Sequence, residues 1–145
     1  MAPLTKGRTT PEFAGDFREQ SVAAGAVIYT GAMLMRNAAG DLLPGAVAAG
    51  GVGVGRANHD VNNTGGAAGD VTVRYKRGCF GFANGTGADE ITKADIGNVC
   101  FILDDQTVAR VDGGGGRSPA GIIDDVAGAV VHVRFDEALT KAAAA

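Results

Sequence analysis

NVCFILDDQTVARV, residues 98–111, places two adjacent carboxylates between an apolar run and a second, thinner apolar run. This spacing is typical of a tight hairpin, in which Asp104 and Asp105 form the turn and bond the nearby backbone. A catalytic pair and half of a metal site are the alternatives, and both require the acids to converge with other acids or with His, Lys or Cys. No Ser-His pair, HExxH motif or DxDxDG loop accompanies them. The stretch therefore predicts two core strands joined by an acidic turn.

Strand-like patterns continue on both sides of this stretch. In residues 70–78 apolar side chains alternate with polar ones, as in a half-buried strand, and residues 130–135 repeat the pattern. Residues 22–35 indicate one or two buried strands with a bulge or bend at Gly31. We count about seven to nine short strands and no helix long enough for a βαβ crossover, which predicts an all-β barrel or sandwich.

We expect three parts in the chain, namely an N-terminal arm, a single β domain and a C-terminal tail, at residues 1–20, 21–136 and 137–145. The tail is either a terminal helical turn or frayed. Inside the domain, one short helical turn is expected near residues 92–96, capped by Thr92 and ended by Gly97. Residues 57–69 are dense in Asn, Asp and Gly without periodicity, which predicts a long loop.

Composition and charge limit the classes of function. The 145 residues include 24 glycines, about 17% of the chain against a typical ~7%, which we assign to turns and bulges between strands. Residues 1–88 carry eight basic and six acidic side chains, and residues 89–137 carry four and ten. Without a dense Lys/Arg stripe, nucleic-acid binding is not expected. No apolar run approaches 18 residues and residues 1–20 lack an apolar signal segment, so neither a membrane span nor a secretion signal is expected.

The remaining chemical groups do not form a motif. Cys79 and Cys100 lie in apolar segments outside any CxxC pair, and His59 and His132 sit at no metal-ligand spacing. We expect both cysteines to be reduced in an intracellular protein, with a disulfide or metal pair as the alternative. The second acid pair, at residues 124–125, follows a short apolar run and precedes another, which again predicts a turn between strands.

Two glycine-rich stretches resemble anion-binding loops. GGVGVGRA, residues 50–57, is not followed by the helix of a dinucleotide fingerprint and lacks the lysine of a P-loop, so close backbone packing is the better interpretation. GGGGR, residues 113–117, is more typical of a mobile loop tip than of an anion nest. We therefore expect no catalytic residue, no cofactor and no metal.

The N-terminal arm contains two isolated aromatic residues. Residues 10–12 could open one helical turn at Pro11, with Phe13 and Phe17 on the same side. The arm is either a disordered tail or a segment whose phenylalanines anchor on a neighbouring subunit.

The C-terminal half resembles the closing segment of small tailed-phage capsid decoration (cement) proteins and their prophage relatives. The matching elements are a D-x-G helical turn, an acidic DD-x-TV hairpin, a Gly/Ser-rich loop, an AG-x-(I/V) segment, an acidic turn and a last alternating strand. Here they are Asp95-Ile96-Gly97, Asp104 to Val108, Gly113 to Ser118, Ala120 to Ile123, Asp124-Asp125 and Val130 to Phe135. VTVRYKRGCFGFAN, residues 71–84, resembles a further strand of that family. The likeness covers residues 70–135 well and residues 22–56 loosely, and residues 57–69 have no counterpart.

This resemblance implies a β-tulip-like small barrel that binds the outside of the expanded head, commonly as a trimer, and stiffens it against DNA pressure. The implied partners are the major capsid protein and further copies of the chain, without nucleic acid or membrane. The implied location is the capsid exterior, after synthesis in the host cytoplasm. No catalytic residues carry over, and the implied capsid or subunit contact lies on the arm, at Pro11, Phe13 and Phe17.

Two other functions remain as competitors. One is a tail or head-fibre component with a ligand- or carbohydrate-binding face. It requires exposed aromatics, and the two tyrosines, Tyr29 and Tyr75, and six phenylalanines lie mostly in core-like runs. The other is a small β-fold hydrolase that uses Asp104 or Asp124.

Overall fold

The computed structural model describes residues 2–10 and 15–145. Their strands, in chain order, are β1 (Phe17–Ser21), β2 (Val27–Ile28), β3 (Met33–Arg36), β4 (Leu42–Pro44), β5 (Val52–Ala57), β6 (Val61–Asn62), β7 (Thr72–Lys76), β8 (Cys79–Asn84), β9 (Val99–Ile102), β10 (Thr107–Ala109), β11 (Pro119–Ala127) and β12 (Val130–Arg134). The helical elements are the 3₁₀ turns η1 (Gly87–Asp89) and η2 (Lys93–Asp95) and the helix α1 (Glu137–Ala144). The predicted all-β class is confirmed, but these twelve strands exceed the seven to nine expected. Strands of two or three residues, such as β2, β4, β6 and β10, are too short to show alternation in the sequence.

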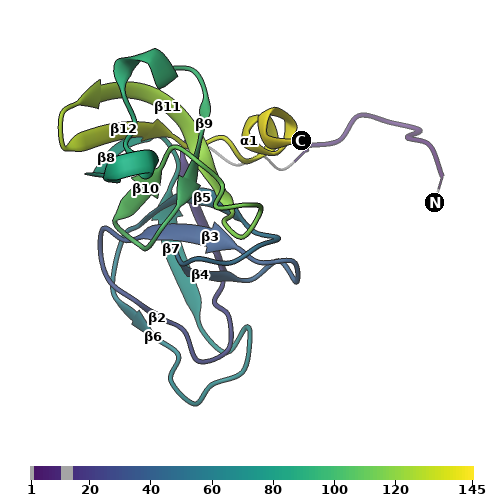
Figure 1. The fold of residues 1–145 in the computed structure, drawn as a ribbon. Helices are drawn as coiled ribbons and strands as arrows, with labels where there is room; N and C mark the ends of the chain where they lie inside the picture. The colour runs from purple at the N-terminus through teal and green to yellow at the C-terminus, as the bar shows by residue number, and fades with distance from the viewer. Residues whose placement is uncertain (1, 11–14) are drawn as a thin grey trace.

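Five strands close into a small barrel, in the order β10-β8-β12-β11-β9. It forms the upper part of the molecule in Figure 1. All neighbouring strands are antiparallel except β10 and β8, which run parallel. Closure leaves this half without a free sheet edge. Its core contains Met33, Met35, Phe82, Ile91, Cys100, Ile102, Val108, Ala120, Ile123, Val131, Val133 and Phe135.

The other half is a five-stranded sheet, in the order β1-β7-β5-β3-β4. Its two edges approach each other, because Val22, the residue after β1, forms a parallel bridge with Leu42 in β4. The amide of Ala23 donates to the carbonyl of Leu42 at 2.8 Å. The sheet therefore wraps around a second core, made of Val22, Ile28, Ala32, Leu34, Leu42, Val54, Ala57, Val61, Val73 and Tyr75. The two-stranded ribbon β2-β6 lies at the far end of this half (Figure 1).

Strand β3 separates the two cores. Met33 and Met35 are part of the barrel core, whereas Leu34 lies in the core of the five-stranded sheet, as the alternation of a strand requires. A Cβ atom at Gly53 in β5 would overlap the carbonyl group of Ala120 in β11. The glycines of residues 50–57 thus allow two backbones to cross in contact, which agrees with the packing interpretation of this stretch.

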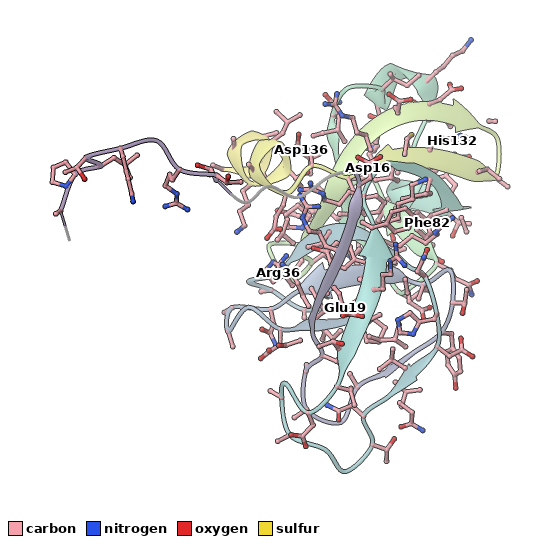
Figure 2. All side chains as sticks on the ribbon, turned by 180° about the vertical axis from the view of Figure 1, so that it is seen from behind. Asp16, Glu19, Arg36, Phe82, His132 and Asp136 are labelled. Carbon is pink, nitrogen blue, oxygen red and sulfur yellow. The ribbon has the colours of Figure 1, made fainter. Side chains whose placement is uncertain are left out.

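The guanidinium of Arg36, at the end of β3, forms hydrogen bonds to four other segments. Arg36 donates to both carboxylate oxygens of Glu137, at 2.8 and 3.2 Å, and to Gln20 Oε1 at 2.8 Å. It also donates to the Gly40 carbonyl and to the Tyr75 hydroxyl, at 3.2 and 3.4 Å. Figure 2 shows Arg36 on the side of the molecule that carries α1. Arg36 therefore fixes the C-terminal helix to the sheet.

Several predicted boundaries were wrong. Residues 17–20, assigned to the arm, belong to β1, where Phe17–Ser21 pairs along its length with β7. Its polar sequence resembles an arm because an edge strand buries little apolar surface. The predicted loop at residues 57–69 contains β6. At the C-terminus, where either a helical turn or a frayed tail was expected, Glu137–Ala144 forms α1, whose N-cap Asp136 accepts the Leu139 amide at 3.0 Å.

The predicted helical turn near residues 92–96 is present as η2. Thr92 and Asp95 form a capping box, in which the Thr92 amide donates to Asp95 Oδ2 at 2.8 Å. Gly97 follows with a φ of 92°, which suits glycine at the end of such a turn.

Candidate functional site

The N-terminal arm is the first candidate for an interaction surface. Residues 2–10 of the arm are all exposed, and Figure 1 shows them extending away from the body beyond α1. They include the cations Lys6 and Arg8, no acid, and Leu4, which is 71% exposed. Pro11 and Phe13, which the sequence analysis assigned to the contact, lie outside the described residues.

Phe17 is at the base of this arm, in the first position of β1. Its ring centroid lies 4.5 Å from the guanidinium carbon of Arg74 and 5.4 Å from Lys76 Nζ, a cation–π arrangement on the surface of the sheet. The side chain remains 37% exposed. The expected helical arrangement of Phe13 and Phe17 is wrong for Phe17, because strand pairing with β7 fixes its position.

A hollow of about 280 Å³ lies where the arm meets the body. It is lined by Asp16, Arg77, Gly78, Arg134, Phe135 and Asp136. The amide of Arg77 donates to the Asp16 carbonyl at 3.0 Å, and Figure 2 shows Asp16 and Asp136 close together at the end of β1. Two arginines and two aspartates balance its charge, so this hollow suits a polar, uncharged or zwitterionic contact.

Asp104 and Asp105 lie in the connection between β9 and β10, which pair in antiparallel register from Val108 to Ile102. Asp104 Oδ1 accepts the Gln106 amide at 2.9 Å, the bond expected of an Asp that shapes its own turn. The Leu103 amide donates to the Thr107 carbonyl at 3.1 Å and closes the hairpin.

The second acid pair was expected in a turn, and this is wrong. Asp124 and Asp125 lie within β11, where the register with β12 shifts between Ile123 and Asp125 in a β-bulge. The turn follows four residues later, at Gly128, which has a φ of 62°. Glycine takes the turn because only it adopts a positive φ without cost, whereas the acids fill the bulge.

The bulge brings one acid close to a cysteine. Cys79 Sγ lies 3.6 Å from Asp124 Oδ2, and burial together with this carboxylate raises the pKa of the Cys79 thiol. A nucleophilic cysteine requires the opposite shift, since the thiolate is the reactive form. Asp125 is opposite His132 in the strand register, but its Oδ1 accepts the Val126 amide at 2.8 Å. Among the described residues no three His, Cys, Asp or Glu side chains are placed to hold a metal ion.

Both cysteines are free in the structure. Cys100 is buried in the barrel core, and its Sγ contacts the Gly121 carbonyl at 3.6 Å. Burial raises the pKa of Cys100 to about 12, so this thiol is an inert core group.

The arginine of the GGGGR loop is already engaged. Arg117 donates to both carboxylate oxygens of Asp89, at 2.8 and 3.3 Å, and to the Val111 carbonyl at 2.9 Å. Asp112 Oδ1 accepts the Gly114 amide at 3.1 Å. These bonds attach the loop to η1, and they leave its arginine paired with an acid rather than directed at an external anion.

Comparison with known proteins gives no relative. No family model, no curated protein and no solved structure matches this chain. Among the helices of the described residues, none is long and apolar enough to cross a membrane.

Sequence reasoning missed two features of the surface. Tyr29 was placed in a core-like run, but it is 63% exposed, because the chain turns at Gly31 between β2 and β3. The Arg36 cluster was also missed, since its partner Glu137 is 101 residues away in the sequence. An arginine directly after a buried apolar run is the one local signal for the second feature.

Proposed function

We propose that this protein is a structural virion component of a tailed phage or prophage, which binds the outer surface of the expanded capsid and stabilises it. The proposal rests first on the motif resemblance of residues 70–135 and on the all-β class. It includes no catalytic step. Its partners are the major capsid protein and further copies of the chain, as a homotrimer.

The observation that carries the proposal furthest is the arm. Residues 2–10 are exposed along their whole length and carry a charge of +2 from Lys6 and Arg8. Nine extended residues span at most roughly 30 Å, enough to reach across a neighbouring subunit of a lattice. An exposed, cationic segment of this reach suits binding along a partner surface better than it suits the stability of its own domain.

The way the arm is attached to the body also supports a role in capsid binding. Phe17 is held between strand pairing with β7 and the cations Arg74 and Lys76, so the arm continues directly into a sheet. In the proposed complex, Pro11 and Phe13 contact the capsid or a neighbouring subunit, and Phe17 anchors the arm to its own body. Each contact can be weak, because repetition over the lattice and within a trimer multiplies the affinity.

The test is removal of the arm without damage to the sheet. Deletion of residues 2–14 leaves β1 intact, whereas a deletion that extends to residue 20 would remove most of that strand. We expect the shortened chain to keep the unfolding temperature of the full chain and to lose binding to expanded heads in co-sedimentation. A variant with residues 2–10 reordered at constant composition separates sequence-specific contact from charge. Full binding by the deletion variant would rule out the arm as the attachment.

A further inference from the structure

A second hollow, of about 310 Å³, opens between the two halves of the molecule. It is lined by Tyr29, Thr30, Gly31, Ala32, Asp105 and Gln106. One wall is the connection from β2 to β3, and the other is the tip of the β9–β10 hairpin. Its lining combines one large exposed aromatic ring with a carboxylate and a carboxamide, a combination absent from the hollow at the base of the arm.

The wall that carries Tyr29 is held in place. Asp60 Oδ1 accepts both the amide and the hydroxyl of Thr30, at 2.7 and 2.9 Å. These two bonds lower the pKa of Asp60. The Gly31 amide donates to the Ala57 carbonyl at 3.0 Å. Tyr29 is therefore presented on a fixed turn, although its side chain is 63% exposed.

The facing wall is equally fixed by its backbone. The Asp105 carbonyl accepts the Met33 amide at 2.8 Å, and the Gln106 carbonyl accepts the Ala83 amide at 2.8 Å. Neither the Asp105 carboxylate nor the Gln106 carboxamide forms a hydrogen bond or ion pair within the described part of the chain. The hollow thus offers acceptors and donors without partners on a rigid frame, which lowers the entropic cost of binding.

We propose that this hollow is a binding site for a pyranose sugar. The apolar C–H face of a sugar ring suits the face of Tyr29, whose side chain is apolar in its body and polar at its tip. Sugar hydroxyls both donate and accept, so a pair of them can donate to Asp105 and exchange hydrogen bonds with the Gln106 amide. Few polar groups in a concave site with an aromatic side chain are the ordinary composition of a small-molecule site.

A cationic ligand fits these groups less well. An ammonium or guanidinium has donors only, so it can use the Asp105 carboxylate and the Gln106 carbonyl, whereas the exposed N–H groups of Gln106 stay with water and add nothing to its binding. The neighbouring acids add little attraction for a cationic ligand, because the Asp60 carboxylate accepts hydrogen bonds from Thr30 and the Asp104 carboxylate accepts the Gln106 amide. The Asp105 carboxylate and the Gln106 carboxamide therefore suit a ligand with hydroxyl groups better than a positively charged ligand.

This inference goes beyond capsid binding and does not depend on it. The site lies on the body, in residues 29–32 and 105–106, and uses no residue of the arm. On a virion it would give each decorating copy a weak affinity for a glycan surface, and many copies would add up to adhesion.

The experiment is an amide-resonance NMR titration of the full-length protein with the methyl glycosides of glucose, galactose, mannose and N-acetylglucosamine. We expect saturable shifts for at least one glycoside, centred on the amides of Tyr29, Gly31, Asp105 and Gln106. Tyr29→Ala should weaken binding at least about tenfold and Tyr29→Phe by no more than about twofold, because stacking needs the ring and not the hydroxyl. Val130→Ala, at an exposed apolar position outside the hollow, is the matched control and should leave binding unchanged.

Three results would overturn the proposal. The first is the absence of saturable shifts at these amides with all four glycosides. The second is undiminished binding by Tyr29→Ala. The third is binding of tetramethylammonium in place of the glycosides, which would make the hollow a cation site. If Tyr29→Ala does not fold, the shift map of the wild-type protein decides the question by itself.

Discussion

Replacement of Arg36 by alanine should loosen the C-terminal helix and destabilise the whole domain. The Arg36 and Glu137 side chains are 19% and 27% exposed, so water only partly screens the pair. The substitution removes two hydrogen bonds to a carboxylate, as well as those to Gln20, Gly40 and the Tyr75 hydroxyl. Charged hydrogen bonds contribute roughly 1.5–3 kcal/mol each in favourable cases.

The expected loss is well below the sum of these bonds. Without Arg36, the Glu137 carboxylate becomes hydrated and keeps its favourable position in the first turn of α1. The full cost of a buried unpaired charge, about 3–5 kcal/mol, therefore does not apply. We expect a loss of about 2–3 kcal/mol in the free energy of unfolding, or about 5–10 °C in Tm for a domain of this size. An isolated eight-residue helix is not stable in water, so α1 should also lose amide protection.

The assay is urea denaturation of Arg36→Ala, Glu137→Gln and the double variant. A double-mutant cycle should give a coupling energy of about 1–2 kcal/mol between the two side chains. Arg36→Lys keeps the charge without the planar fork and should recover less than half of the loss. Arg110→Ala, at an exposed arginine, is the control and should change stability by less than about 0.5 kcal/mol. A loss below about 0.5 kcal/mol for Arg36→Ala, with α1 still protected from exchange, would refute this reasoning.

Three further predictions follow from the same structure. Gly53→Ala should lower the free energy of unfolding by about 3 kcal/mol or more, because the added Cβ would overlap the Ala120 carbonyl. Gly116→Ala, whose Cβ has space, should stay within about 0.5 kcal/mol of wild type in the same urea assay. Equal effects of the two substitutions would contradict the close crossing of β5 and β11. The backbone amide and the hydroxyl of Thr30 lower the pKa of Asp60 below 3.8, so the stabilisation by Asp60 is present above pH 4 and is lost as the pH falls through the lowered pKa. Thr30→Val removes only the hydroxyl bond and keeps the amide bond, so carboxylate NMR should show the pKa of Asp60 rising part of the way toward 3.8. Cys79 should react slowly with a disulfide reagent, and faster as the pH rises toward its raised pKa. Asp124→Asn should accelerate the reaction by lowering that pKa. Cys100 should react only after unfolding, and rapid labelling of Cys100 in the native state would contradict its burial.

Residues with strong local patterns were predictable from the sequence. The alternation of Val73 and Tyr75 with polar neighbours is a direct consequence of period two, and both are buried in β7. Thr92 and Gly97 carry the capping and positive-φ chemistry that marks the ends of a helical turn. These signals depend on only a few neighbouring residues, so they can be interpreted without knowledge of the tertiary structure.

The features that depend on distant partners were not predictable. The closure of five strands into a barrel depends on the parallel pairing of β10 with β8, residues that are separated by more than twenty positions. The acids at residues 124–125 were predicted to form a turn, because an acid pair between two apolar runs has the same sequence pattern in a bulge as in a turn. Tyr29 became a candidate ligand contact only when the hairpin tip with Asp105 and Gln106 was seen opposite it.

The most direct test of the proposed function is electron cryomicroscopy of expanded capsids mixed with the full-length protein. We expect protrusions at regular lattice positions, each with β-rich bodies joined to the capsid through density for the arm, and a bare lattice with the variant lacking residues 2–14. A bare lattice with the full-length protein, at concentrations that saturate any weak site, would contradict it.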